Sequence, residues 1–173
     1  RNDLNEALED NSYNALGLYY RGVVLAQLGQ DDEAVADLDH SLELQPNQPQ
    51  AYQQRAMLHR KAKRHKAAVT DFEQVAARIG SSAQLDYERG LLYHDMKAYD
   101  LAVEAFGEAI ERNRGMAAAY RARAESFTAL GREEEATADY TAVTMLEPDE
   151  PEAFVHRAMV LARLGKKDEA LAD

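Results

Sequence analysis

The chain has 173 residues, enough for one ordinary domain or a short array of repeats, and apolar residues make up 46% of it. With 29% charged residues, four prolines and nine glycines, the composition indicates a folded, helix-rich protein rather than a disordered or loop-rich one. The formal net charge of -11 repels phosphate groups, which argues against broad binding to nucleic acid or to an anionic membrane surface.

One pattern repeats five times along the chain. Arginine recurs every 34 residues, at Arg21, Arg55, Arg89, Arg123 and Arg157. The next residue is small each time: Gly22, Ala56, Gly90, Ala124 and Ala158. An alanine stands thirteen residues after each arginine, and a large apolar residue follows it where the chain continues: Leu38, Phe72, Phe106 and Tyr140. Five copies in phase indicate a repeat protein, in which each unit packs on its neighbours.

The first copy shows that each unit contains two helices. Leu18, Gly22, Leu25 and Leu28 fall on one face of a first helix, and Ala34, Leu38, Ser41 and Leu42 fall on one face of a second. Glycine at residues 29, 131 and 165 is expected to end the first helices, because it accepts a left-handed backbone. Proline at residues 46 and 148 bars continuation of the second. Each unit is therefore predicted to be a helical hairpin.

This pattern resembles the tetratricopeptide repeat family, which places an aromatic residue at position 4, a small residue at 8, alanine at 20 and proline at 32. With residue 15 as position 1, full repeats are expected at 15–48, 49–82, 83–116 and 117–150, and a truncated repeat at 151–173. Residues 1–14 fit the end of a preceding repeat, so that 1–173 forms a single array. The resemblance implies an all-α, right-handed superhelical solenoid of antiparallel helical hairpins.

The second and third repeats depart most from the family pattern. Arginine replaces the leucine of position 7 in every copy, as in a common variant of the family. The second repeat has His59 at position 11, Lys63 in place of the turn glycine and Gly80 in place of the proline. The third has Asp86 at the aromatic position and Arg114 in place of the proline. The predicted hairpins survive all of these changes.

The residues that usually carry catalysis or bind metal show no suitable pattern. Cysteine is absent, which removes thiol nucleophiles and cysteine-rich zinc sites. The five histidines (His40, His59, His65, His94 and His156) form no i, i+4 pair near a carboxylate, so they are interpreted as solvated or packing residues. No phosphate-binding glycine loop or serine nucleophile motif is present. We therefore expect no enzyme activity, cofactor or metal.

The charged runs have a structural explanation in every repeat except the second. Asp31 to Glu33, Glu133 to Glu135 and Asp168 to Glu169 fall at the start of second helices, where carboxylates offset the helix dipole and can cap free N–H groups. The second repeat instead places Arg60, Lys61, Lys63, Arg64 and Lys66 around its turn. Two interpretations stay open for this basic run: a solvated turn, or a docking site for an acidic partner.

In the family, positions 5, 9, 12 and 13 of the first helix help to line a concave groove that receives extended peptides or helices. The resemblance assigns to positions 5 and 9 the residues Tyr19, Val23, Gln53, Met57, Tyr87, Leu91, Arg121, Glu125, Val155 and Met159. Arg60, Lys61 and His94 follow at positions 12 and 13. Capture of the acidic tail of cytosolic chaperones is not implied, because Tyr19, Val23 and Gln54 stand where that activity needs lysine and asparagine.

The repeated arginines have matching carboxylates. Position 23, on the second helix, holds Asp37, Asp71, Asp139 and Asp173, whereas the third repeat has Ala105 there. We predict that each guanidinium binds a carboxylate of its own or the preceding hairpin, with bidentate geometry. Because Arg89 faces Ala105, its available partner in the preceding hairpin is Asp71.

These features together favour a protein-interaction scaffold that binds a peptide or partner helix with apolar and some acidic character, and neither nucleic acid nor a membrane interior. The alternatives are a recruiting arm of a larger enzyme and a self-assembling scaffold. No apolar run approaches the roughly 20 residues of a membrane span, so we expect a soluble protein, with the cytoplasm favoured. Since the chain starts at Arg1 and stops at Asp173 within expected helices, Leu161, Leu164 and Leu171 are expected to mark an uncovered end that gives weak end-to-end self-association.

Overall fold

The computed structural model describes residues 15–173, and within them the chain forms ten α-helices and no β-strand. The described residues fall into two compact units, the first ending at Ser81 and the second covering Ser82–Asp173. Each unit is considered by itself. The expected end of a preceding repeat at 1–14 lies outside the described residues.

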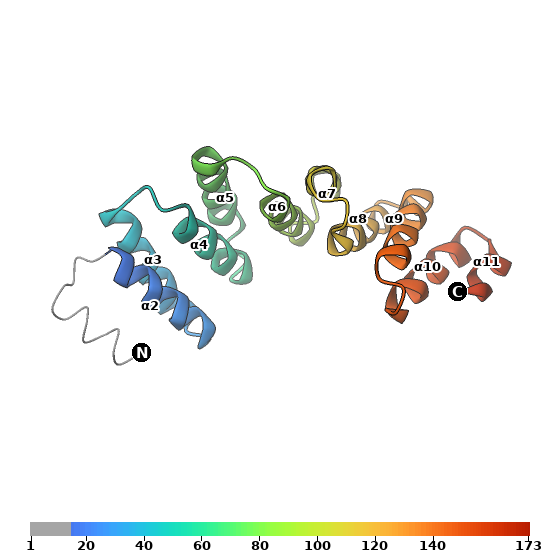
Figure 1. The fold of residues 1–173 in the computed structure, drawn as a ribbon, viewed down its shortest axis with the longest axis horizontal. Coiled ribbons are helices and arrows are strands. Elements are labelled where there is room, and N and C mark those ends of the chain that lie inside the picture. Colours follow the sequence, from blue (N-terminus) through green and yellow to red (C-terminus); the bar gives the residue numbers. More distant parts are fainter. Residues whose placement is uncertain (1–14) are drawn as a thin grey trace. The chain divides into compact units, whose positions relative to one another are not determined.

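The first unit contains two helical hairpins, coloured blue to green in Figure 1. They consist of α2 (Ala15–Gln27) with α3 (Asp31–Leu44), and α4 (Pro49–Lys61) with α5 (His65–Ile79). Within each hairpin the two helices pack along their length, and α3 also packs against α4. Proline stands at the start of α4, where its fixed φ suits a helix and its missing N–H is not needed.

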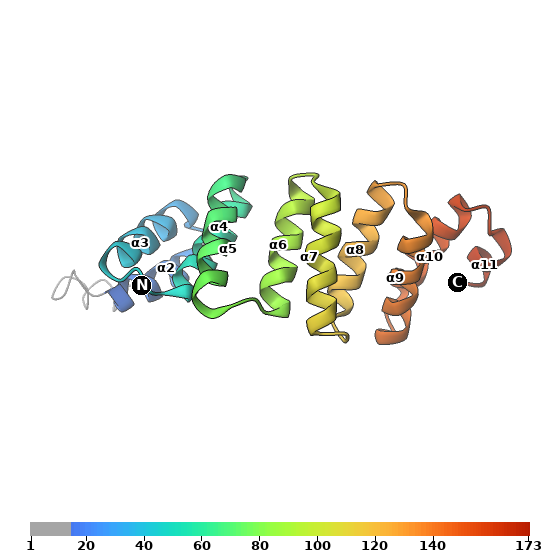
Figure 2. The ribbon, with the colours of Figure 1, turned by 90° about the horizontal axis from the view of Figure 1, so that it is seen from above.

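The second unit contains α6 (Ala83–Asp95), α7 (Tyr99–Arg112), α8 (Ala117–Ala129), α9 (Glu133–Leu146), α10 (Pro151–Arg163) and α11 (Lys167–Ala172). Consecutive helices pair in the order α6 with α7, α8 with α9, and α10 with α11, and α7 and α9 pack against the hairpin that follows each of them (Figure 2). The predicted all-α class and its helical hairpins are confirmed.

The turn inside each hairpin contains one residue with a left-handed backbone. Glycine fills this place in three hairpins, with φ of 75° at Gly29, 72° at Gly131 and 76° at Gly165. The prediction that glycine ends these first helices is confirmed. In the other two hairpins the same place holds Lys63 and Lys97, with φ of 56° and 59°. A residue with a Cβ is strained in this conformation, so these two lysines destabilise their turns.

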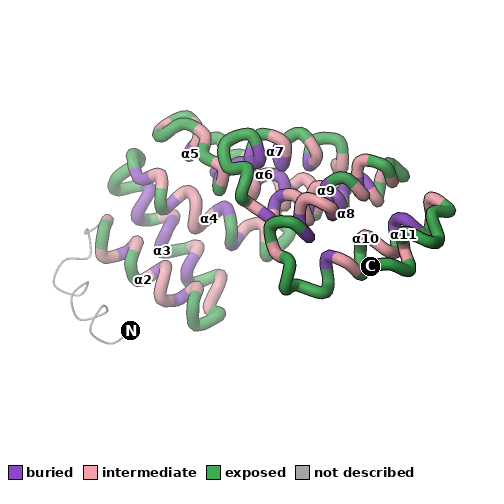
Figure 3. The backbone as a smooth tube through the Cα atoms, turned by 45° about the vertical axis from the view of Figure 1, so that its right-hand side comes forward, coloured by how far each residue is buried: buried purple, intermediate pink, exposed green. Residues whose placement is uncertain are grey.

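The core of each hairpin is formed by the repeated small and large apolar residues. The alanines at residues 34, 68, 102 and 136 are fully buried, as are Leu38, Phe72 and Phe106, and Tyr140 is nearly so. Buried positions recur along the helices of both units (Figure 3). The expectation that Leu28 shares the buried face of Leu18 and Leu25 is wrong, since Leu28 follows the last residue of α2 and is 59% exposed.

Glycine permits very close helix contact in the third hairpin. A Cβ added to Gly90 would lie 2.4 Å from Cδ1 and Cε1 of the Phe106 ring. At the equivalent place in the first hairpin, a Cβ on Gly22 would lie 3.1 Å from Cγ of Leu38. The small residue after the repeated arginine therefore lets the two helices approach closely in these two hairpins, and the contact is tightest at Gly90.

Three of the arginines that recur every 34 residues bind a carboxylate of their own hairpin in bidentate geometry, as predicted. Arg21 contacts Asp37 through Nε and Nη2 at 2.5 and 2.6 Å, and Arg123 contacts Asp139 through the same atoms at 2.7 Å each. Arg157 forms the same paired contact with Asp173. Two parallel charge-assisted hydrogen bonds hold each second helix against its first helix.

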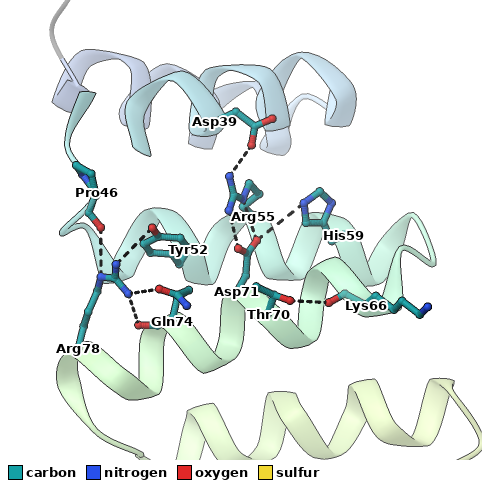
Figure 4. Close-up of polar contacts among 10 residues, drawn as sticks. All are labelled: Asp39, Pro46, Tyr52, Arg55, His59, Lys66, Thr70, Asp71, Gln74 and Arg78. Carbon is teal, nitrogen blue, oxygen red and sulfur yellow. Dashed lines mark hydrogen bonds and ion pairs between the residues drawn. The ribbon is translucent and has the colours of Figure 1, made fainter. Parts of the chain in front are cut away.

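Arg55 extends this contact to the preceding hairpin (Figure 4). Its Nε and Nη2 donate to Asp71 at 2.9 and 2.6 Å, and its Nη1 donates to Asp39 of α3 at 2.6 Å. These carboxylates raise the pKa of Arg55 against the opposing effect of burial, and the hydrogen bond that Arg55 donates to Asp71 is the largest cause. The guanidinium therefore joins three helices of the first unit.

Arg89 departs from the others because Ala105 stands where its carboxylate would be. Its Nη1 lies 3.3 Å from Asp86 of its own helix and 3.5 Å from Glu108 of α7. The second oxygen of Asp86 accepts a hydrogen bond from Nε of Arg112 at 2.7 Å. The carboxylates of Arg89 thus come from its own hairpin, which the expectation of Asp71 in the preceding hairpin missed.

Candidate functional site

The predicted groove residues of the first unit lie on α2 and α4. Tyr19 and Val23 are half-buried on α2, and Gln53 and Met57 occupy the equivalent places on α4. Tyr19 packs against the apolar core that α2, α3 and α4 share, and burial raises the pKa of its hydroxyl. Met57 is 40% exposed and is the most accessible apolar side chain of this set.

The predicted basic groove residues of the first unit belong to the turn between α4 and α5. We name this turn, with Arg60, Lys61, Lys63, Arg64 and Lys66, the basic turn. Lys61 Nζ lies 2.7 Å from Asp31, and Arg64 Nη2 lies 3.0 Å from Asp32. These two carboxylates lie at the start of α3. Sequence analysis missed these two ion pairs, because their partners come from different hairpins.

His59 lies in the last turn of α4, directly before Arg60. Its Nε2 is 3.9 Å from Asp71, and its Nδ1 is sealed from solvent without a hydrogen-bond partner. Burial lowers the pKa of the imidazole, and the nearby Arg55 acts in the same direction, whereas Asp71 opposes them. His59 is therefore a neutral packing residue near pH 7, in agreement with its sequence interpretation.

In the second unit, α6 carries Tyr87, Leu91 and His94. The ring of Tyr87 lies 5.8 Å from the ring of the buried Phe106, and Leu91 packs against the core cluster that contains Phe106. Both side chains are half-buried. These two predicted groove residues therefore help to complete the core of their hairpin.

His94 is oriented by a neighbouring hairpin. Its Nδ1 lies 2.9 Å from Oγ of Ser126 on α8, and that hydroxyl donates its one proton to the carbonyl of Ala122 at 2.9 Å. Both contacts are satisfied together only when Nδ1 is the donor, which makes Nε2 the acceptor in the neutral ring. The ring edge also contacts Tyr99, with centroids 5.2 Å apart.

The remaining predicted residues of the second unit lie on α8 and α10. Arg121 Nη2 donates to Glu147 at 2.5 Å, and its Nε is sealed without a partner. Glu125 is exposed one helical turn later. On α10, Val155 and Met159 are 57% and 54% exposed, although both are apolar and lie four residues apart on one helix face. These two side chains form the most accessible apolar surface of the set.

Tyr140 was expected only in the core, but its phenol lies among predicted groove residues. Burial raises the pKa of Tyr140 to about 12; the carboxylate of Glu125 acts in the same direction, and Arg121 and Arg163 oppose it. His156 stacks on the ring, with centroids 5.5 Å apart and planes at 10°. The phenol therefore remains protonated at neutral pH.

One pocket of about 300 Å³ is lined by Thr137, Thr141, Arg157, Leu161, Glu169, Ala172 and Asp173. None of the residues predicted for the groove lines it. Leu161 is buried in its wall, so the expectation that this residue marks an uncovered end is wrong, whereas Leu171 is exposed. Within residues 15–173, no group of three or more histidine or acidic side chains is placed to hold a metal ion. No described helix is long and apolar enough to cross a membrane.

Profiles of the tetratricopeptide repeat match residues 15–48, 49–78 and 84–115, which together are more than half of the chain. The chain belongs to the tetratricopeptide repeat family. A comparison with curated proteins found no match.

Solved tetratricopeptide structures share the fold. The chain superposes on YrrB, a tetratricopeptide repeat protein described as having an unusual peptide-binding site, with a TM-score of 0.80 and 22% identity over 98% of this chain and 87% of that one. For MamA of Desulfovibrio magneticus the TM-score is 0.85, with 18% identity over 91% of this chain and 89% of that one. For pilF of Pseudomonas aeruginosa the TM-score is 0.78, with 16% identity over 91% of this chain and 72% of that one. At these identities the likeness shows the fold.

Proposed function

We propose that this chain binds a peptide or a partner helix on the first helices of its hairpins. The accessible apolar side chains there carry the proposal. Most large apolar residues of the repeat pattern are buried between helices, whereas Met57, Val155 and Met159 point outward from positions that share one helix face. Apolar groups left outside a core commonly mark an interaction surface, and methionine adapts to irregular partners.

We call the residues at positions 5 and 9 of the first helices the first-helix face. In the first unit it combines Tyr19 and Met57 with the nearby cations of the basic turn. In the second it combines Val155 and Met159 with Arg121 and Glu125, of which Arg121 is already paired with Glu147. A ligand that fits either surface has apolar residues for contact area and polar or acidic residues between them.

The fold and the family support the general role, since tetratricopeptide repeats are protein-interaction scaffolds. The peptide-binding site of YrrB supports a peptide ligand for a chain of this fold. We also propose that the 34-residue period joins all the hairpins into one array over residues 1–173, and that the chain itself has no catalytic role.

The test begins with affinity capture by the chain and identification of the captured proteins by mass spectrometry. Binding of the captured partner is then measured for Met57→Gln and Met159→Gln, which change exposed side chains without opening the core. Met145→Gln is the matched control, because Met145 lies on the second helix α9 and is 76% exposed. We expect each first-helix variant to weaken binding roughly fivefold or more, a typical loss for an interface anchor, and the control to leave it unchanged.

The opposite pattern would overturn the proposal. If Met145→Gln weakened binding and both first-helix variants retained full affinity, the ligand would lie on the second helices instead. Tyr87→Ala is a poor test, since Tyr87 supports Phe106 and its loss would disturb the fold.

A further inference from the structure

The basic turn reverses the charge pattern of the other hairpins. The first turn of the second helix contains Asp31, Asp32 and Glu33 in α3, three glutamates in α9, two acidic residues in α11 and Asp100 in α7. The first turn of α5 contains no acidic residue, and the last turn of α4 contains Arg60 and Lys61. Lys66, in the first turn of α5, opposes the dipole of that helix and is unfavourable for folding, whereas Arg60 and Lys61 lie at the C-terminus of α4, where cations are favourable.

Lys63 adds a second local cost at the same turn. Its backbone is left-handed, with φ of 56°, where three other hairpins use glycine. A Cβ added to any of those three glycines would meet nothing within 4 Å, so packing does not require a side chain at this place. A sequence that breaks two local rules at one turn commonly serves a function at that point.

We propose that the basic turn binds an acidic segment of a protein ligand. The inference rests on the proposed function, because the segment belongs to the same ligand that contacts the first-helix face. Met57 is three residues before Arg60 and four before Lys61 on α4, so these side chains share one helix face. The ligand therefore carries an apolar residue close to a short run of aspartates or glutamates.

The existing ion pairs leave this turn available. Arg64 and Asp32 are half or more exposed, and their pairing is worth little in water, so a ligand carboxylate can replace Asp32. The side chain of Lys61 is likewise exposed, so its pairing with Asp31 can also be exchanged. Within residues 15–173, Lys63 and Lys66 are exposed and form no ion pair. Two cations are thus unneutralised, and two more can exchange partners.

The charge of the remaining chain favours a short acidic peptide over a nucleic acid or an anionic membrane. The second unit contains 11 lysines and arginines against 19 aspartates and glutamates. The chain as a whole has a net charge of -11, which repels an extended polyanion. A short acidic segment contacts the basic turn alone and avoids that cost.

The test uses the full chain and a fluorescent synthetic peptide in which leucines are flanked by glutamates. The turn variant is Lys63→Gly with Lys66→Glu. The control is Lys97→Gly with Lys167→Glu, which makes the same charge change at the left-handed lysine and a second-helix start of other hairpins. Binding is measured by fluorescence anisotropy at low and at physiological salt, and folding by the thermal unfolding temperature.

We expect the turn variant to bind the peptide roughly threefold to thirtyfold more weakly, as the loss of a few exposed ion pairs implies, and the control to bind as the parent does. The unfolding temperature of the turn variant should rise by roughly 2–8 °C, because both local costs are relieved, so weaker binding cannot come from unfolding. A peptide with glutamine in place of every glutamate should lose the dependence on the basic turn.

Equal losses in both variants would show general charge attraction and overturn the proposal, as would absence of binding by the parent chain. Tighter binding of single-stranded DNA or phosphatidylserine vesicles than of the peptide would overturn it in favour of a polyanion. Loss of self-association in the turn variant, without any peptide effect, would make a second copy the occupant and also overturn it. If peptide binding depended on the basic turn but was unchanged in Met57→Gln and Met159→Gln, the proposal for the first-helix face would be refuted. The proposal that the basic turn binds an acidic segment would be retained.

Discussion

Two glycine substitutions in the third hairpin give a sharp test of the packing. Gly90 lies inside α6 and Gly107 lies inside α7, so alanine at either place gains about 1 kcal/mol of helix propensity. Their surroundings differ. A Cβ at Gly107 meets only Nη1 of Arg123, at an ordinary 3.6 Å, whereas a Cβ at Gly90 lies 2.4 Å from two carbons of Phe106.

The magnitude follows from the distance that Phe106 must move. Carbon atoms in contact lie about 3.5–4.0 Å apart, so the ring must retreat by roughly 1 Å. Phe106 is fully buried, and overpacking of this size in a core costs about 1–3 kcal/mol. The second hairpin has Ala56 with Phe72, both buried, which shows that a related arrangement exists and keeps the expected cost within that range.

The helix-propensity gain cancels between the two variants, so Gly90→Ala should be less stable than Gly107→Ala by about 1–3 kcal/mol. Urea unfolding followed by far-UV circular dichroism measures both free energies in the same unit of the protein. Phe106→Leu should reduce the difference, because a Cβ opposite leucine in the first hairpin lies 3.1 Å from the side chain, against 2.4 Å opposite phenylalanine here. Equal stability of the two alanine variants would refute the packing argument at Gly90.

Three further perturbations test the turns and the charged contacts. Lys97→Gly should raise the free energy of unfolding by about 0.5–1 kcal/mol in urea titration, because glycine relieves the left-handed strain; no gain would mean that the lysine side chain contributes a contact. Asp139→Ala should lower it by about 1–3 kcal/mol, since Arg123 is mostly buried and loses both hydrogen bonds, whereas Glu135→Ala, in an exposed pair, should leave it nearly unchanged. Burial depresses the pKa of His59, so the unfolded chain binds the proton more readily and stability falls as pH drops below about 6.5. Urea titrations of the parent and of His59→Leu, at neutral and mildly acidic pH, should show a smaller fall in the variant; identical pH profiles would contradict that assignment.

The features that sequence reasoning found are those in which one position carries the physical requirement. A left-handed turn needs glycine at Gly29 whatever lies around it, and a guanidinium such as Arg21 needs a carboxylate at a fixed helical distance, which Asp37 supplies. Such requirements repeat with the hairpin, so a period of 34 residues is enough to reveal them.

The features that sequence reasoning missed depend on contacts with a neighbouring hairpin. Leu91 is half-buried because the core cluster that it meets includes Ala122 of α8, and Lys61 is neutralised by Asp31 of α3. His94 donates to Ser126 for the same reason. A helical pattern gives the face on which a side chain lies but not the groups that a neighbouring hairpin brings to it. Exposure and pairing at the predicted site therefore required the structure.

The third hairpin shows why Asp86, at the repeat's aromatic position, was interpreted as a departure when single positions were compared. In the second hairpin the guanidinium of Arg78 lies 4.5 Å from the centre of the Tyr52 ring. One repeat later, Arg112 stands at the place of Arg78 and Asp86 at the place of Tyr52, and they form an ion pair. The arginine at this position thus has a partner in both hairpins: the face of an aromatic ring in the second and a carboxylate in the third.

The same carboxylate also compensates for Ala105. Asp86 is fully buried between Arg89 and Arg112, so it supplies to Arg89 the negative charge that the second helix lacks in this hairpin. A buried carboxylate with no cation would be strongly destabilising, and with two cations it is neutralised and hydrogen-bonded. Asp86 looks like a defect when its position is compared with other aromatic positions. In the folded hairpin it replaces two missing interactions at once, which is why the third repeat keeps its structure while departing from the pattern.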